Sequence, residues 1–291
     1  MATYVLQNEQ LCVTCDTHGA EVISVRRGNC EYVWQGDPAY WTGRAPMMFP
    51  ICGRLADDAY TYEGKTYSMR QHGFLRNSEL EMAERTEESL RFVLRANQET
   101  RAIYPFDFVL TVTHTLQGDT VRTSVCVQNT GADVLPFAFG AHPAFNLPMA
   151  GEGTFEDCYI EFGEPCSPDE ILKSESNLIS GKHRAYPLAD GLTLPLSHRL
   201  FDNDSIFFAR AADRVTLRSE RSERSVTLHY PQFPFLGIWH KPKTDAPYLC
   251  IEPWCGLPSY EGEEENLATK PNMFRLRAGE SKTLSFAISY R

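Results

Sequence analysis

Alternation of apolar and polar residues with a period of two is the feature that most restricts how this chain can fold. It is clearest over residues 108–116 and 121–128, two runs that are separated by the turn residues Gly118 and Asp119. Successive side chains of a β-strand point to opposite faces, so these runs predict two strands paired as a hairpin. Similar pairs of runs lie at 22–34, 60–69 and 215–230. Hairpins spread along the chain predict an antiparallel sandwich or barrel.

Helical patterns are few and short. We expect helices only near residues 37–41 and 263–268, and we interpret the polar stretch 167–198 as long connections at one edge of the sandwich. No linker or change of composition divides the chain, and its 42% hydrophobic residues suffice for a sizeable core. We therefore expect residues 1–291 to form a single domain.

The charge balance and the apolar pattern exclude several classes of partner. Lys and Arg number 28 against 38 Asp and Glu, a net charge of −10, which argues against a nucleic-acid partner. No apolar run approaches the ~18 residues of a membrane span, and the first nine residues have neither a basic leader nor an apolar signal core. Nine cysteines, scattered among apolar residues, suit a reducing compartment. We expect a soluble, cytoplasmic protein without a membrane partner.

The motifs of common cofactors and metals are missing. The chain contains no G-x-G-x-x-G, no G-x-x-x-x-G-K-[ST] and no G-x-S-x-G motif. Cys12 and Cys15 have no second pair to complete a zinc site, and their spacing places the two thiols on opposite faces of a strand. The clustered histidines of a cupin-type metal barrel are absent as well. We therefore expect no nucleotide, no metal and no other cofactor.

His142 ends an otherwise apolar run, residues 135–143. In a strand it shares one face with Pro136, Ala138 and Gly140, whose small side chains would leave room above the sheet for a ligand that His142 contacts. The alternative is a histidine of the core that bonds to backbone.

Glu252 lies in the apolar run 247–256. A carboxylate there loses several kcal/mol of solvation unless a cleft or a partner receives it. Such an environment raises the carboxyl pKa, which suits a general base. A structural ion pair with an arginine is the alternative.

A third group of candidate functional residues consists of arginine, histidine and glycine residues between positions 53 and 76. Arg54 follows Gly53 at the end of a buried run, Gly73 allows the backbone after His72 to approach another surface closely, and Arg76 follows. Convergent Arg and His side chains suit hydroxyls, a ring oxygen or a phosphate.

Four short segments, in this order, are similar to the aldose 1-epimerase (mutarotase) family: Gly53-Arg54, His72-Gly73-Phe74, His142-Pro143-Ala144-Phe145 and Glu252-Pro253-Trp254. The resemblance extends over most of the chain. It implies an all-β, large antiparallel β-supersandwich of the galactose mutarotase type with few short helices and a sugar-binding cleft, and it implies no metal and no cofactor. The expected activity is interconversion of the α- and β-anomers of a hexose by acid/base ring opening and reclosure.

The resemblance also implies roles for individual residues. It makes His142 the general acid, Glu252 the general base, and His72 and Arg54 sugar-binding or transition-state partners. The family has an aspartate that holds a sugar hydroxyl, for which the candidates are Asp204 and its neighbour Asp202. Trp239 or Trp254 would offer an aromatic face to the sugar, unless it belongs to the core.

Two other functions stay open. The segment from His72 to Arg76 resembles the branch of the family that contains glucose-6-phosphate 1-epimerases. In that branch Arg76 would join Arg54 at a phosphate. A hexose-6-phosphate 1-epimerase is therefore the first alternative. A non-catalytic sugar-binding protein on the same fold is the second. The partner in each case is a small sugar or sugar phosphate.

Overall fold

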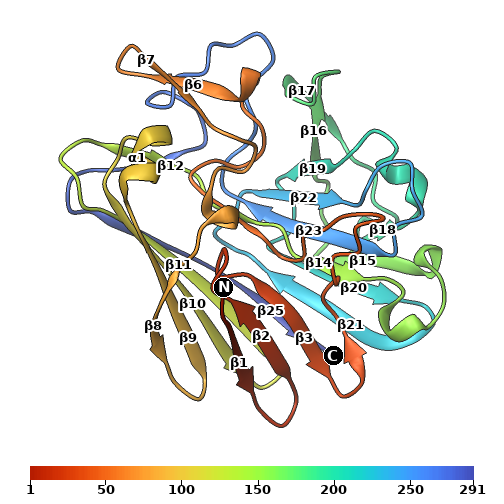
Figure 1. Cartoon of the computed structure of the whole chain (residues 1–291). Helices are drawn as coiled ribbons and strands as arrows, with labels where there is room; N and C mark the ends of the chain where they lie inside the picture. Colours follow the sequence, from red (N-terminus) through yellow and green to blue (C-terminus); the bar gives the residue numbers. More distant parts are fainter.

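The computed structural model describes residues 1–291 and is built of antiparallel β-sheets (Figure 1). Every pair of named strands is antiparallel. The largest sheet has nine strands, in spatial order β18 (Thr193–Pro195), β15 (Cys158–Phe162), β20 (Arg214–Ser219), β21 (Ser222–His229), β25 (Ser281–Tyr290), β11 (Thr120–Asn129), β10 (Phe108–Gln117), β9 (Ser89–Arg95) and β8 (Glu81–Arg85).

A second large sheet has eight strands. Its order is β17 (Ile179–Ala185), β16 (Asp169–Lys173), β19 (Ile206–Ala209), β22 (Phe235–Trp239), β23 (Tyr248–Trp254), β13 (Gly140–Ala141) and β5 (Met47–Met48), with β14 (Ala144–Asn146) also paired to β23. Smaller sheets are formed by β1 (Thr3–Gln7), β2 (Cys12–Asp16), β3 (Val22–Arg27) and β4 (Cys30–Glu31), by β6 (Ala59–Tyr62) with β7 (Lys65–Ser68), and by β12 (Leu135–Phe137) with β24 (Phe274–Leu276).

The predicted all-β fold and its hairpins are confirmed. β10 and β11 pair over ten residues each, and the side chains of β10 alternate between buried and half-buried along almost the whole strand, as their period of two predicts. β3 with β4, β6 with β7 and β20 with β21 form the other three hairpins. Cys12 is half-buried and Cys15 buried on β2, and all nine cysteines are free.

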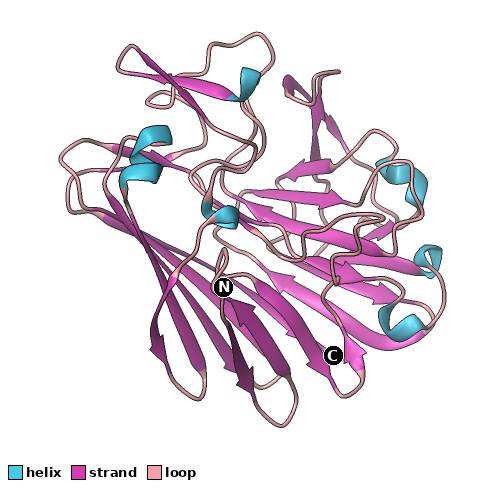
Figure 2. Cartoon of the chain, viewed as in Figure 1, coloured by secondary structure: helices cyan, strands magenta, loops and turns pink.

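Helices are few and short compared with the strands (Figure 2). The α-helix, α1 (Gln98–Ile103), was not predicted; Asn97 begins it by accepting a hydrogen bond from the backbone N–H of Thr100. No helix is long and apolar enough to span a membrane. Five 3₁₀ segments are η1 (Ala56–Asp58), η2 (Leu75–Asn77), η3 (Met149–Gly151), η4 (Phe155–Asp157) and η5 (His198–Phe201).

Both predicted helices are wrong. Residues 37–41 form only one helical turn, in which the Trp41 N–H donates to Asp37 O (2.9 Å). Residues 263–268 are irregular because their backbone pairs with β6: the Thr61 N–H donates to Glu265 O (2.7 Å) and the Leu267 N–H donates to Thr61 O (3.0 Å). Backbone groups bound to another segment cannot also close helical turns.

The interpretation of residues 167–198 as connections is wrong in part. This stretch contains β16, β17 and β18, and β17 and β18 do lie at sheet edges. Most of β17 is exposed, so its sequence shows no alternation of apolar and polar residues. An edge strand with little buried surface lacks the pattern that identifies strands elsewhere in the chain.

Side chains of both large sheets share one core. Its main cluster contains 73 buried residues, from Leu6 to Tyr290. Phe162 of the nine-stranded sheet packs edge-on against Phe208 of the eight-stranded sheet, with ring centroids 6.1 Å apart. β23 lies inside the second sheet between β22 and β13, and all seven of its side chains are buried. A polar side chain on β23 therefore needs a partner or a pocket.

The space for a ligand that we expected above the small residues beside His142 is not observed. The run breaks into β12 and β13, and the space at Gly140 is filled by core side chains: a Cβ there would lie 2.7 Å from Met48 Cε and 3.2 Å from Trp254 Cδ1. Small residues here permit close packing of the core. His142, which directly follows β13, is the residue of this run that reaches the pocket described next.

Candidate active site

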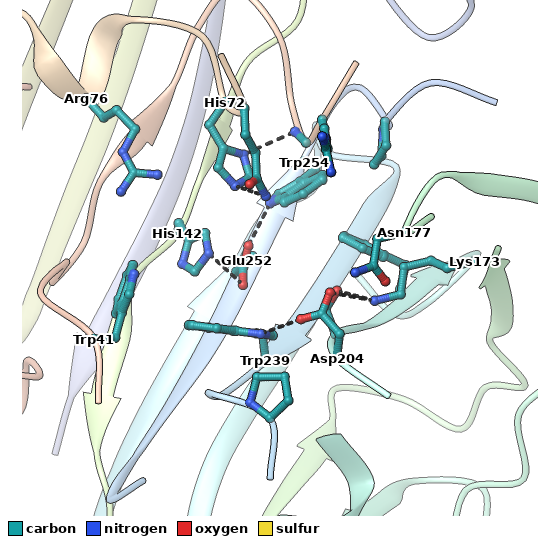
Figure 3. Close-up of a pocket in the computed structure, with 17 residues that line it drawn as sticks. Trp41, His72, Arg76, His142, Lys173, Asn177, Asp204, Trp239, Glu252 and Trp254 are labelled. Atoms are coloured by element: carbon teal, nitrogen blue, oxygen red, sulfur yellow. Dashed lines mark hydrogen bonds and ion pairs between the residues drawn. The ribbon is translucent and has the colours of Figure 1, made fainter. Parts of the chain in front are cut away.

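One pocket of about 470 Å³ brings together all seven residues that the sequence singled out (Figure 3). They come from segments up to 198 residues apart, since Arg54 and Glu252 both line it. Of the two aspartates left open, Asp204 lines the pocket and the exposed Asp202 does not. The seven residues are Arg54, His72, Arg76, His142, Asp204, Trp239 and Glu252.

Glu252 enters the pocket from the middle of β23. Opposite it on β22 stands Gly237, where a Cβ would lie 3.0 Å from the Phe207 ring and 3.3 Å from Glu252 Cβ. A larger residue would crowd the carboxyl group, so this glycine makes room for it. Glu252 Oε2 accepts a hydrogen bond from Trp254 Nε1 (3.1 Å), and its side chain is only 2% exposed.

His142 completes a buried pair with Glu252. Its Nε2 lies 3.3 Å from Glu252 Oε1. The ring packs against Trp41, with centroids 4.9 Å apart, and meets Trp239 and His72 nearly edge-on. Nδ1 is buried without a hydrogen-bond partner. These rings fix the imidazole so that Nε2 faces the carboxyl group.

Burial dominates the protonation of this pair. It raises the pKa of Glu252 well above its usual range, with a smaller contribution in the same direction from Asp204. Burial, with a smaller contribution from the nearby Arg76 cation, lowers the pKa of His142 to about 3. Both shifts disfavour charge, because a low-dielectric site destabilises ionised groups. Both shifts favour the uncharged form of the pair, in which the protonated Glu252 carboxyl donates to His142 Nε2.

His72 sits on a tight turn that brings it beside His142. His72 and Gly73 both have positive φ, +68° and +71°, and a Cβ at Gly73 would collide with the carbonyl oxygen of Phe49. The predicted close approach at Gly73 is therefore confirmed. The Gly53 N–H donates to His72 Nδ1 (3.1 Å), and the His72 N–H donates to Gly53 O (2.9 Å). These two hydrogen bonds link the turn that carries His72 to the loop that carries Arg54.

His72 is a neutral hydrogen-bond donor. Because Nδ1 accepts a hydrogen bond, Nε2 carries the proton. Burial lowers the pKa of His72 well below its usual value, and His142 and Arg76 lower it further. The ring therefore stays uncharged at neutral pH. Its Nε2 lies 3.2 Å from the side-chain amide nitrogen of Gln71 at the wall of the pocket, and it would exchange that neighbour for an oxygen of a ligand.

Asp204 forms the opposite wall of the pocket from His142 (Figure 3). It lies in the loop between η5 and β19 with a φ of +72°. Its Oδ1 accepts from Trp239 Nε1 (2.7 Å) and its Oδ2 accepts from Lys173 Nζ (3.0 Å), which also donates to Ser205 Oγ (3.0 Å). The carboxylate is held rigidly and remains about one-third exposed to the pocket.

The two arginines differ in their partners. Arg54 forms an ion pair with Asp58 through Nε (3.2 Å), and both side chains are about half exposed. Arg76, on η2, has no ion-pair or hydrogen-bond partner, although the carboxyl groups of Glu21 and Glu252 are close enough to influence its pKa. Glu79, the acidic residue three positions further along the chain, binds the amino terminus and Thr17 and not Arg76.

One group of side chains has the composition of a metal site. The ligand atoms of His142, Cys250 and Glu252 lie within 4.8 Å of one another. All three residues are buried, and burial raises the pKa of the Cys250 thiol well above its usual value. A metal ligand must be a thiolate, so the environment opposes metal binding at this cysteine.

Comparison with known proteins identifies the family of the chain. The model of the family described as aldose 1-epimerase matches residues 2–289. The chain belongs to the aldose 1-epimerase family. It is an isomerase of that family, and a galactose mutarotase-like fold was correctly predicted.

Relatives of this aldose 1-epimerase family member match it end to end. The chromosomal protein LacX of Lactococcus lactis is 35% identical over 99% of each chain. The galactose mutarotase related enzyme of Lactobacillus acidophilus is 33% identical, with a TM-score of 0.95 over 100% of this chain and 97% of that one. A galactose mutarotase-like protein of Lactobacillus casei is 31% identical, with a TM-score of 0.94 over 100% of both chains.

Several residues of the epimerase pocket were not predicted from the sequence. Trp41 falls in the segment predicted as a helix, and Lys173 and Asn177 fall in the stretch interpreted as connections. Their signal is weak, because a lysine at the end of a short half-buried strand has the same appearance in the sequence as a solvated lysine. Trp254, named as an alternative to Trp239, lines the same pocket.

Proposed function

We propose that the chain interconverts the α- and β-anomers of an unphosphorylated aldohexose, with Glu252 as the general base and His142 as the general acid. The observation that carries this proposal is the buried contact of 3.3 Å between the two side chains in a pocket with polar walls. Ring opening needs one group to remove a proton and one to supply it on the two sides of C1. A neighbouring carboxyl and imidazole meet that need.

In the proposed reaction Glu252 removes the proton of the anomeric hydroxyl while His142 protonates the ring oxygen. The C1–O5 bond breaks, and C1 and O1 become an aldehyde carbonyl. Rotation about C1–C2 then presents the other face of the carbonyl to O5. The same two proton transfers in reverse close the ring as the other anomer, so the catalyst returns to its initial state.

The protonation of the pair fits this cycle. Ring opening begins from a carboxylate and an imidazolium and ends with both groups uncharged. The charged form contains the same single proton as the unliganded uncharged pair and arises from it by transfer across the 3.3 Å contact. Burial disfavours the charged form, and it therefore assists the two transfers that open the ring.

The remaining walls are suited to hold the sugar. His72 would donate from Nε2 to a sugar oxygen, and Asp204 would accept from a hydroxyl in a charge-assisted hydrogen bond. Trp239, fixed by its bond to Asp204, would pack against the pyranose ring. Arg54 would contribute further donors at the half-exposed rim of the pocket.

The test is polarimetry or NMR on freshly dissolved α-anomers of glucose, galactose and glucose 6-phosphate, with and without protein. We expect the protein to accelerate the approach to anomeric equilibrium of a free hexose far beyond the spontaneous rate. If none of the three sugars equilibrates faster with protein, the proposal is wrong for hexoses.

The second candidate substrate is a hexose 6-phosphate. The observation in its favour is Arg76, whose guanidinium has no ion-pair partner and lines the pocket. Arg54 carries less weight, because Asp58 already offsets its charge.

Replacement of Arg76 decides between the two substrates. If Arg76 holds a phosphate, Arg76→Ala removes a contact of ~1.5–3 kcal/mol and lowers kcat/KM for glucose 6-phosphate by roughly ten- to a hundredfold, while glucose is little affected. Equal losses on both substrates, with an unchanged melting temperature, would leave the free hexose as the substrate.

A further inference from the structure

Trp41 reaches the His142–Glu252 pair from a segment without regular secondary structure. Residues 35–45 join β4 to β5, and they contain no strand and only the helical turn at residues 37–41. The Trp41 ring lies against the His142 imidazole, with centroids 4.9 Å apart and the planes inclined by 31° (Figure 3). Trp41 is the one residue of this segment that lines the pocket. The segment therefore meets the pocket through a single side chain, which contacts the proposed general acid.

Two hydrogen bonds fix the backbone near Trp41. Trp34 Nε1 donates to Trp41 O (2.8 Å). The hydroxyl of the neighbouring Tyr40 donates to Asp245 Oδ1 (3.0 Å), which lies in the connection between β22 and β23. Because β23 carries Glu252, the second bond fixes the segment relative to the strand of the proposed base.

Aromatic rings surround the indole on its other sides. Trp41 meets Trp239 edge-on, with centroids 5.5 Å apart and an interplanar angle of 78°, and it stacks on Tyr248 at 5.9 Å. Side chains packed in this way leave few voids, so a ring moves only when its neighbours move. The His142 imidazole therefore cannot turn its Nε2 away from Glu252 without displacing the indole.

A glycine makes room for the indole. A Cβ at Gly43 would lie 2.3 Å from Trp41 Cζ2, which is too close for any stable contact. Gly43 does not have a positive φ, so a left-handed backbone conformation does not explain why glycine stands here. The position of the Trp41 ring does explain it, because every other residue would push the indole out of its place beside His142.

We propose that Trp41 is a positioning residue: its indole holds the His142 imidazole with Nε2 toward Glu252 and keeps water away from the contact between them. Trp41 has no proton to exchange in the reaction, so it acts only through His142. Its ring is half-buried and borders the pocket, so its removal would admit water to the pair. This inference rests on the proposed function of the pocket.

The first test replaces Trp41 and measures turnover of a free hexose. We expect Trp41→Ala to lower kcat by about tenfold or more, since a small displacement of a catalytic group costs much of its effect. Trp41→Phe should recover most of the loss, because a phenyl ring still stacks on the imidazole. Thermal melts show whether each variant is folded, and Trp41→Phe keeps the test valid if Trp41→Ala is not.

The pH profile separates positioning from a general loss of stability. Burial raises the pKa of Glu252 and lowers that of His142, so water that enters after Trp41→Ala weakens both shifts. The pair then loses its proton more readily, and the alkaline limb of kcat/KM should move to lower pH than in wild type. The other charged or titratable side chains that face the pair are unchanged in this variant: His72, Arg76, Lys173, Asp204, Tyr248 and Cys250.

Gly43→Ala tests the position of the indole without removing it. The added methyl group collides with the ring, so we expect the same fall in kcat and the same displacement of the alkaline limb as for Trp41→Ala, in smaller measure. Gly131→Ala is the matched control. Gly131 also lacks a positive φ, and its Cβ would lie 3.3 Å from Asp107 Cβ, where neither residue lines the pocket. It should change neither kcat nor the pH profile.

The outcomes separate this role from the proposed function. A folded Trp41→Ala protein with wild-type kcat and pH profile refutes the positioning role and leaves the acid/base function intact. A rise in KM alone, with kcat and the pH profile unchanged, means that Trp41 contacts the sugar, and it also overturns the proposal.

NMR titration of the imidazole tests the position independently of turnover. If the wild-type protein turns over no sugar, the proposed function fails, but the His142 signals, assigned with His142→Asn, can still be followed. A titration that moves toward the usual pKa of histidine in Trp41→Ala supports the role of the indole. Signals that titrate as in wild type refute it.

Discussion

Replacement of Glu252 by glutamine tests the proposed base with little disturbance of the fold. The amide has nearly the same volume as the carboxyl group that is buried on β23. Its oxygen can still accept from Trp254 Nε1, and its NH₂ group can donate to His142 Nε2 as the protonated carboxyl does at 3.3 Å. Because burial already favours the uncharged carboxyl, we expect the free energy of unfolding to change by less than ~1 kcal/mol.

The expected effect on catalysis is much larger. A positioned general base contributes roughly 10²–10⁴ in rate, equivalent to ~3–5 kcal/mol of activation free energy. Glutamine cannot take up the proton of the anomeric hydroxyl. We therefore expect kcat for Glu252→Gln to fall by about 10²–10⁴, while the affinity for sugar stays within a few-fold because the other walls of the pocket are intact.

The assay is NMR exchange or polarimetry of an α-aldohexose, corrected for spontaneous mutarotation, with thermal melts and calorimetric sugar binding alongside. Glu21→Gln is the matched control: Glu21 is another carboxyl whose pKa burial raises, but it does not line the pocket. It should leave kcat nearly unchanged. A folded, sugar-binding Glu252→Gln protein with kcat within about tenfold of wild type would refute the assignment.

Three further outcomes are expected. Asp204→Asn should raise KM for a free hexose roughly tenfold or more through loss of a charge-assisted hydrogen bond, and Asp202→Asn, outside the pocket, should leave the steady-state kinetics on the same hexose unchanged. Because the pKa of His142 is lowered to about 3 and that of Glu252 is raised, the pair keeps its single proton across weakly acidic pH. The kcat/KM profile should therefore be level from pH 7 to pH 5 and fall only toward pH 3, whereas a fall centred near pH 6.5 contradicts this account. Exhaustive treatment with a chelator should leave activity intact, and activity recovered only by a divalent ion would overturn the metal-free mechanism.

The sequence determined the strands with one face in the core. β10 and β11 are evident from their alternation, because a period of two needs only neighbouring residues and one buried face. The chemically unusual residues were also evident. Glu252 lies within an apolar run and His142 lies at the end of another. Both are unusual there, because burying a polar group without a partner costs free energy.

Tertiary structure decided what these residues contact. His142 and Glu252 are 110 positions apart, and their contact depends on β13 pairing with β23, which no local pattern encodes. Lys173 was missed because a half-buried lysine near an exposed edge strand looks the same in sequence as a solvated one.

The protonation of the pair likewise depends on the assembled fold. Free in water at neutral pH, the carboxyl group would be ionised and the imidazole would be mostly uncharged but easily protonated, whereas within the protein Trp41, Trp239 and the core behind β23 exclude water from both groups. This exclusion of water determines which side chains have a shifted pKa and whether each pKa is raised or lowered. Solvation is a property of everything that surrounds a side chain, so it is fixed only when segments distant in sequence have packed around it.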